Sequence, residues 1–261
     1  MEVKDGYTNG TFSWVDLATR DFETCKHFYG QLLSWDYEDL DVDGGIYSIA
    51  RYRGQKVAAL FPLSEKKLND EIPSHWSSYI TVGSVDDTQS LWANEGGTVL
   101  ASAFNVGNGA GRMAVLKDPS GAIVKLWEPK EVFGAELVND LNALCWNELY
   151  SKNLDKSRDF YQKVFGWDYE HEPDSDYVMI SNRGNMNGGM LDMNGNAPDY
   201  IPPHWMVYFT VDRIEDSGDL AEKFGGVSLT EVVPVGAGKF CVFQDPSGAV
   251  FSLIERPVLD S

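Results

Sequence analysis

The sequence predicts an α+β protein made by tandem duplication, with curved mixed sheets and helices packed on the outer faces of the sheets. Two observations lead to this class. The second half of the chain repeats the first, and both halves alternate strand-like and helix-like segments in the same order. The 261 residues, with 43% hydrophobic and 23% charged side chains, form an ordinary globular composition with room for two domains.

Three segments of the first half recur in the same order in the second half. They are HFYGQLLSWDYE (27–38) and DFYQKVFGWDYE (159–170), HWSSYITV (75–82) and HWMVYFTV (204–211), and the turn DPSGA at 118–122 and 245–249. The spacing drifts by a few residues, as insertions in loops would produce. We therefore predict two domains, residues 8–130 and 140–257.

The first unit starts with a predicted strand, TFSWVDLA (11–18), which is rich in aromatic and branched residues. An amphipathic helix follows within 21–35. Its apolar positions recur at helical spacing: Phe22, Cys25, Phe28/Tyr29 and Leu32/Leu33. Three short strands are then predicted at about 35–40, 45–52 and 55–62, with Gly44–Gly45 and Gly54 at the turns.

The rest of the unit repeats this order. A polar loop (63–74) leads to the strand 75–82, and a helix runs from Val85 to about Glu95, where Gly96–Gly97 end it. Three strands finish the unit, at about 98–105, 112–117 and 123–127, and the DPSG turn joins the last two. Each unit is therefore two βαβββ modules, and the chain holds four, whose sheets leave a concave inner face.

Charge and cysteine content exclude several classes of partner and compartment. The net charge of −19 disfavours nucleic acid and anionic membrane surfaces, because both are polyanions. We find neither an apolar run long enough to span a bilayer nor a signal peptide. The three widely spaced cysteines (Cys25, Cys145, Cys241) indicate buried thiols of a reduced, cytoplasmic protein, with a nucleophilic cysteine as the less favoured alternative.

The aromatic strand, the FY-containing helix, the following SWDY or GWDY, and the DPSG turn together resemble the vicinal oxygen chelate superfamily. That superfamily includes glyoxalase I, bleomycin-resistance proteins and extradiol dioxygenases. The resemblance covers about residues 11–256 and implies modules paired into half-barrels, with a pocket on the concave side. Because four modules lie in one chain, the paired arrangement forms within it. We expect a monomer, with a homodimer as the alternative.

The resemblance also implies a divalent metal in many members, and its ligand positions map onto this chain. They are Trp14, Ser77 and Lys125 in the first half, and Trp146, Met206 and Ser252 in the second. These side chains are not common ligands of divalent metals, so we expect no metal cofactor, no glyoxalase I isomerisation and no iron-dependent ring cleavage. A two-residue slip of the mapping would instead offer Asp16 and Glu148 as ligands, with His75 and His204 nearby.

Strand alternation predicts which side chains line each concave face. Phe12, Trp14, Asp16 and Ala18 share one face of the first strand, and Trp146, Glu148 and Tyr150 share the matching face in the second half. From these faces we select Asp16 and Glu148 as candidate catalytic residues. The candidate substrate-binding residues are Trp14, Tyr79, Lys125, Trp146, Tyr208 and Met206.

Each candidate also has a purely structural interpretation. Asp16 and Glu148 are either carboxylates satisfied by neighbouring groups, or buried bases or anchors for a cation. Lys125 is either a surface residue or a group that neutralises Asp16 or binds an anion. The His75–Trp76 and His204–Trp205 pairs are either anchors, whose Trp packs on the opposite half, or pocket-rim groups.

Two functions follow from these candidates. The first is a metal-free protein, like the bleomycin-resistance proteins, that binds a small aromatic or cationic molecule in a concave pocket. The alternative is a lyase, isomerase or hydroxylase/dioxygenase-type enzyme that uses Asp16 or Glu148 as base or metal ligand. A third arrangement has one degenerate half supporting one working half. Glu148 with Ser252 fits a working site slightly better than Asp16 with Lys125.

Overall fold

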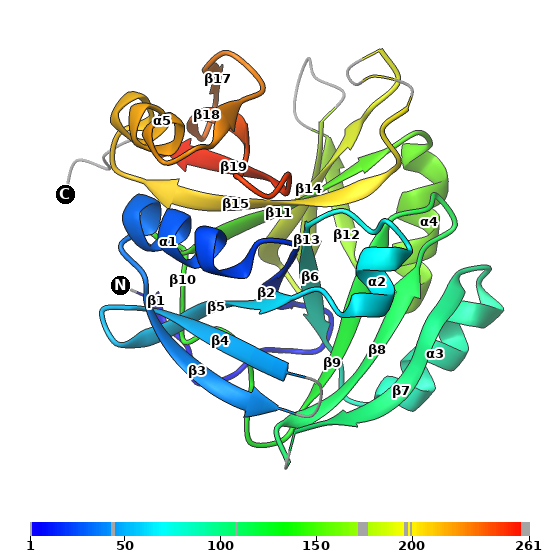
Figure 1. Ribbon diagram of the computed structural model, residues 1–261. Coiled ribbons are helices and arrows are strands. Elements are labelled where there is room, and N and C mark those ends of the chain that lie inside the picture. Colours follow the sequence, from blue (N-terminus) through cyan, green and yellow to red (C-terminus); the bar gives the residue numbers. More distant parts are fainter. Residues whose placement is uncertain are drawn as a thin grey trace.

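The computed structural model describes residues 2–42, 45–107, 109–171, 177–195, 198 and 200–256. Two curled sheets, one from each half of the chain, form half-barrels with helices between and beside them (Figure 1). The predicted α+β class and the tandem duplication are confirmed. Gly44, predicted in a turn, and residue 257, the predicted end of the second domain, lie outside the described residues.

The first unit follows the predicted order of elements. Its first module comprises β2 (Phe12–Thr19), α1 (Phe22–Leu33), β3 (Asp36–Val42), β4 (Gly45–Tyr52) and β5 (Gln55–Pro62). Its second module comprises β6 (His75–Thr81), α3 (Val85–Asn94), β7 (Thr98–Val106), β8 (Gly111–Lys117) and β9 (Ile123–Pro129). The segment 63–74, predicted as a loop, contains a short helix, α2 (Glu65–Asn69). The Ser64 side chain caps this helix by accepting a bond from the Lys67 amide.

The second unit repeats this order with a shortened edge. Its modules comprise β11 (Leu144–Ser151), α4 (Leu154–Phe165), β12 (Asp168–His171), β13 (Val178–Asn182) and β14 (Asn185–Asp192), then β15 (His204–Val211), α5 (Ile214–Lys223), β16 (Val227–Ser228), β17 (Val233–Val235), β18 (Gly238–Gln244) and β19 (Val250–Glu255). The edge strand that matches β7 is split into β16 and β17. Between the units, β10 (Leu137–Val138) pairs with β1 (Glu2–Val3).

The two sheets have the same topology. Their strand orders are β3-β4-β5-β2-β6-β9-β8-β7 and β12-β13-β14-β11-β15-β19-β18-β16. In each sheet the first strands of the two modules pair antiparallel at the centre, β2 with β6 and β11 with β15, and each has a parallel neighbour on its other side. The central four strands therefore form the floor of each concave face.

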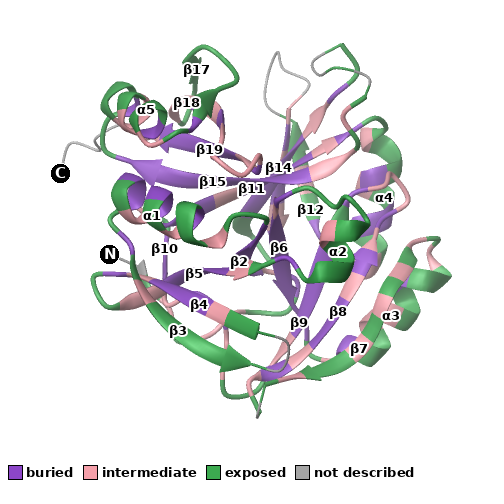
Figure 2. Cartoon of the chain, in the orientation of Figure 1, coloured by how far each residue is buried: buried purple, intermediate pink, exposed green. Residues whose placement is uncertain are grey.

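Helix α1 packs into the space between the two sheets. Phe28 of α1 shares a buried cluster with Val15 and Leu17 of its own sheet and with Phe209 and Phe251 of the second sheet. In Figure 1, α1 lies between its own sheet and strand β15. Figure 2 shows buried residues along the strands that face α1, whereas exposed and intermediate residues make up β3, β7 and the outer side of α3. Units one and two therefore share a continuous core.

A chain of hydrogen bonds joins the two units at the DPSG turn of the second unit. The Tyr29 hydroxyl on α1 donates to Asp245 Oδ2 of the second unit (3.0 Å) and accepts from Trp76 Nε1 (2.9 Å). The Trp76 ring also packs edge-on against Phe209 of the second unit, with centroids 5.2 Å apart. The predicted anchoring of Trp76 on the opposite half is thus confirmed.

The equivalent chain of hydrogen bonds occurs at the DPSG turn of the first unit. Tyr161 of α4 donates to Asp118 Oδ2 (2.8 Å) and accepts from Trp205 Nε1 (3.0 Å). The other carboxylate oxygen of Asp118 accepts backbone bonds from Ser120, Gly121 and Ala122 within its own turn. The FY, HW and DPSG motifs are therefore conserved between the two halves because they meet in pairs across the interface.

The cysteines behave as buried apolar groups. Cys25, Cys145 and Cys241 are all free and buried. Burial, with the Asp245 carboxylate nearby, raises the pKa of Cys25 to about 12, and burial also raises the pKa of Cys145. The thiols of Cys25 and Cys145 are therefore poor nucleophiles at neutral pH. Within the described residues, no helix combines the length and apolar character needed to cross a bilayer.

Candidate active site

The concave face of the first unit holds a buried ion pair. Asp16 on β2 is 1% exposed, and its Oδ1 accepts a bond from Lys125 Nζ at 2.8 Å. Its Oδ2 accepts from the hydroxyls of Tyr79 and Tyr47, the latter at 3.4 Å. Trp14 Nε1 donates to the Tyr47 hydroxyl at 2.9 Å. One carboxylate thus organises a lysine, two tyrosines and a tryptophan.

The strand register brings these residues together. Trp14 pairs with Tyr79 across β2 and β6, and Tyr79 pairs with Lys125 across β6 and β9. The Lys125 ammonium also lies 4.8 Å from the Tyr79 ring centroid and 5.5 Å from that of Phe61. The alternative of Lys125 as a surface residue is wrong, because its side chain is only 11% exposed and pairs with Asp16.

The segment that links the units covers this first site. Ala135 and Val138 are buried in one cluster with Trp14, Tyr79 and Trp127, and Val132 and Tyr7 pack against it. The segment is also tied down by hydrogen bonds: Trp127 Nε1 to the Val132 carbonyl (2.8 Å), and the Tyr7 hydroxyl to the Ala135 carbonyl (2.7 Å). In the first site, Lys125 therefore neutralises the charge of Asp16, and the linking segment covers the site.

The second unit repeats the constellation without the lysine. Tyr177 and Tyr208 donate to the two oxygens of Glu148 at 2.7 and 2.8 Å, and Trp146 Nε1 donates to the Tyr177 hydroxyl at 2.8 Å. Trp146 pairs with Tyr208 across β11 and β15, and Tyr208 pairs with Ser252 across β15 and β19. Ser252 therefore stands at the register position of Lys125.

Glu148 is a buried carboxylate whose charge no lysine or arginine of the described chain neutralises by an ion pair. Burial raises its pKa above the ordinary value near 4.5, and hydrogen bonds from Tyr177, Tyr208 and Tyr150 offset part of that rise. The buried hydroxyl of Ser252 has no hydrogen-bond partner within the described part of the chain. The Ser252 hydroxyl can therefore accept a hydrogen bond from a ligand.

Two aromatic side chains on the strand of Glu148 are partly exposed. Trp146 and Tyr150 are half-buried, whereas Trp14, the counterpart of Trp146, is buried. The Tyr150 ring stacks on His204, with centroids 5.0 Å apart and an interplanar angle of 4°. His204 Nδ1 also bonds to the Pro202 carbonyl (2.9 Å), and burial lowers its pKa, so its ring is neutral at pH 7.

Phe12 does not share the concave face, contrary to the prediction from strand alternation. The β2–β6 register shifts between Phe12 and Trp14, which turns Phe12 to the opposite side. There its ring packs against Trp205 and Trp167 of the second unit, with centroids 4.8 and 5.7 Å apart. The irregularity lets one strand serve both the concave site and the interface.

The residues at these two sites do not fit a divalent metal. In the first unit, Lys125 places an ammonium beside the carboxylate, where a metal cation would be repelled. In the second unit, Glu148 pairs with Met206 across the strands and accepts from tyrosine hydroxyls, which are poor ligands beside a single carboxylate. Across the residues described, no three His, Cys, Asp or Glu side chains gather as a ligand set.

Our sequence reasoning missed Tyr47 and Tyr177. Tyr47 of β4 and Tyr177, just before β13, occupy the same place in their units, since each accepts from the first-strand tryptophan and donates to the carboxylate. The signal was available, because an extension of the repeat comparison would have placed one tyrosine over the other. Met206, a predicted binding residue, is buried and pairs with Glu148 across β11 and β15.

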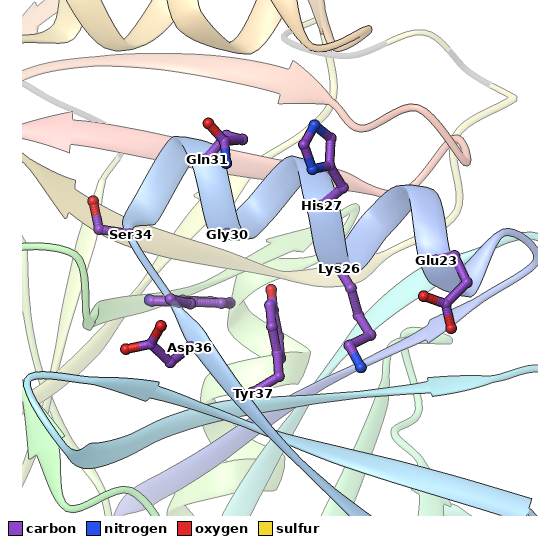
Figure 3. Close-up of a pocket in the computed structure, with 9 residues that line it drawn as sticks. Glu23, Lys26, His27, Gly30, Gln31, Ser34, Asp36 and Tyr37 are labelled. Carbon is purple, nitrogen blue, oxygen red and sulfur yellow. The ribbon is translucent and has the colours of Figure 1, made fainter.

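A separate groove runs along the outside of α1 (Figure 3). Its lining residues are Glu23, Lys26, His27, Gly30, Gln31, Ser34, Trp35, Asp36 and Tyr37. In Figure 3, Tyr37 and Lys26 lie below the helix, whereas His27 and Gln31 project above it. Lys26 is paired with Asp39 at 2.8 Å. The polar groups of this groove therefore diverge, whereas those around Glu148 converge on one carboxylate.

Comparison with known proteins agrees with this architecture. The family model of the Glyoxalase/Bleomycin resistance protein/Dioxygenase superfamily matches residues 11–126 and 132–253. "Putative glyoxylase CFP32" of Mycobacterium tuberculosis is 36% identical over 98% of both chains. "Anthracycline biosynthesis protein DnrV" of Streptomyces peucetius is 27% identical, covering 95% of this chain and 94% of its own.

Two solved structures share the fold. The Mn(II)-bound glyoxalase from Novosphingobium aromaticivorans has a TM-score of 0.65 and 16% identity, over 95% of this chain and 82% of its own. The 2,3-dioxygenase LapB from Pseudomonas sp. KL28 has a TM-score of 0.64 and 16% identity, over 98% and 96%. The resemblance predicted from the repeated motifs is confirmed.

Proposed function

The chain belongs to the Glyoxalase/Bleomycin resistance protein/Dioxygenase superfamily, and we propose that it binds a small aromatic or cationic molecule on the concave face of its second unit. The first unit serves as a scaffold. The observation that carries this proposal is the difference between two sites built to one plan. Asp16 is neutralised by Lys125 and covered by the linking segment, whereas Glu148 is buried with no ion pair from any described lysine or arginine.

The residues around Glu148 suit a small-molecule site. Its hydroxyl and indole neighbours fix the carboxylate in one position, which is the preorganisation that binding sites use. Trp146 and Tyr150, on the same strand as Glu148, are half-buried and offer aromatic surface to a ligand. The side chains at the ligand positions do not fit a divalent metal, so the proposed site is metal-free.

A catalytic role for Glu148 is the second candidate. The raised pKa of this buried carboxyl favours it, because a general acid or base works best when its pKa lies near the working pH. A lyase or isomerase would use Glu148 to move a proton to or from a ligand held beside Trp146 and Tyr208. Glu148→Gln then abolishes turnover even at ligand concentrations that saturate the variant.

The proposal is tested with matched variants of the two units. Compounds of different charge and ring content are titrated into the whole chain, and binding is followed by the indole N–H signals in NMR spectra. We expect binding to weaken at least tenfold in Tyr208→Phe and to persist in Tyr79→Phe, its counterpart in the first unit. Equal weakening in both variants, or binding that depends on Tyr79 alone, would refute a site in the second unit.

Mass spectrometry of a bound compound before and after incubation then separates the two candidates. An unchanged compound supports a binding protein. Conversion by the parent chain, but not by Glu148→Gln, supports an enzyme.

A further inference from the structure

We infer that the ligand of the second unit is an organic cation, a protonated amine whose nitrogen takes the place that the Lys125 ammonium holds in the first unit. This inference rests on the proposed function and names its ligand class. It follows from the duplication, since one copy of the site has a lysine at this position and the other copy has a serine.

The two copies correspond residue by residue through the strand register. The matching pairs are Trp14 and Trp146, Tyr47 and Tyr177, Asp16 and Glu148, Tyr79 and Tyr208, and Lys125 and Ser252. The first four pairs keep an aromatic ring or a carboxylate in both units. Only the last pair exchanges a cation for a small neutral residue.

The first unit displays how this arrangement holds an ammonium group. Lys125 Nζ donates to Asp16 Oδ1 at 2.8 Å and to the Tyr79 hydroxyl at 3.2 Å. The rings of Tyr79 and Phe61 lie within 5.5 Å of it, which adds cation–π attraction. A carboxylate, a hydroxyl and two aromatic faces together replace the water shell of the cation.

The second unit retains each kind of group except the cation. Glu148 supplies the carboxylate and Tyr208 the hydroxyl and one ring. Leu191 stands at the register position of Phe61, but Tyr150 stands at that of Ala18 and brings a ring from the neighbouring strand. The second aromatic ring therefore comes from β11 in the second unit, whereas it comes from β5 in the first.

Two further observations favour a protonated amine over a neutral ligand. Ser252, which pairs with Tyr208 across β15 and β19, has a buried hydroxyl without a hydrogen-bond partner in the described residues, so its Oγ offers an acceptor for an N–H group. The net charge of −19 raises the local concentration of cations. An anionic ligand would meet both this field and a carboxylate that forms no ion pair with any described lysine or arginine.

The test compares three probes of similar shape: benzylammonium, benzyl alcohol and benzoate. Binding to the whole chain is measured by NMR titration. We expect benzylammonium to bind at least tenfold more tightly than the other two, and to lose this preference in Glu148→Gln. The variant S252K, which copies the first unit, should exclude benzylammonium and raise the melting temperature, because its own ammonium fills the place.

The reciprocal variant K125S provides a second readout in the first unit. It should lower the melting temperature, and n-butylammonium, which resembles the lost side chain, should restore part of the loss. Benzyl alcohol or benzoate binding at Glu148 as well as benzylammonium would overturn the cation assignment but leave the second unit as the binding site. If no probe binds the parent chain and n-butylammonium does not rescue K125S, both the assignment and the proposed site fail.

Discussion

Removal of Lys125 should destabilise the protein far more than removal of a surface lysine. The ion pair is buried, since the side chains of Lys125 and Asp16 are 11% and 1% exposed. Breaking such a pair from one side leaves a buried charge and costs about 3–5 kcal/mol. Tyr79 and Tyr47 still donate to Asp16 in the variant, so we expect Lys125→Met to lose about 3 kcal/mol at pH 7, at the lower end of that range.

The double variant Asp16→Asn/Lys125→Met tests the cause. It removes the charge as well as its partner, so about 2 kcal/mol of the loss should return. Both are measured by urea unfolding, followed by tryptophan fluorescence. Lys163→Met is the control, because Lys163 is 62% exposed in its pair with Glu95, and its loss should leave the unfolding free energy nearly unchanged. A loss below about 1 kcal/mol in Lys125→Met, or a double variant no more stable than the single one, would refute a buried, charge-compensating lysine.

Three further predictions concern the second unit and the interface. Burial raises the pKa of Glu148 in the folded state. Its contribution to stability is therefore present below pH 4.5 and is lost as pH rises through the raised pKa. The free energy of unfolding of Glu148→Gln, relative to that of the parent chain, should therefore increase from pH 4.5 to 8. Tyr161→Phe should lose about 1.5–3 kcal/mol in the same urea assay, because it removes a buried bond to the Asp118 carboxylate; a loss below about 0.5 kcal/mol would contradict this role. Gly189→Ala should weaken ligand binding in an NMR titration, because the added methyl group would collide with the Tyr177 hydroxyl that orients Glu148; unchanged binding would show that this contact is not needed.

Much of the architecture follows from local patterns in the sequence. The helices at 22–33 and 85–94 and the strands around them lie within a few residues of the predicted positions, because their apolar periodicity and glycine punctuation are local signals. The short helix α2 was missed because it buries no side chain and so leaves no apolar pattern. The split edge of the second sheet was also unforeseen, because an edge strand needs partners on only one side.

The candidate site was predicted in part. Asp16, Tyr79 and Lys125 were selected from strand alternation, and they do meet on the concave face. Alternation along one strand did not place Tyr47, because β4 is separated from β2 by β5 and the strand order is a property of the folded sheet. It also failed for Phe12, because an irregularity in the pairing of two strands has no signature in a single strand.

The duplication, the order of the modules and the carboxylates of the two concave faces could be read from the amino-acid order, because repeats and periodicity are properties of neighbouring residues. Which concave face is covered became clear from the folded chain alone. That outcome depends on where the linking segment lies and on whether Lys125 turns toward Asp16 or toward solvent. Both are contacts between residues far apart in the chain, and their energies depend on burial, which exists only once the two sheets have folded around a shared core.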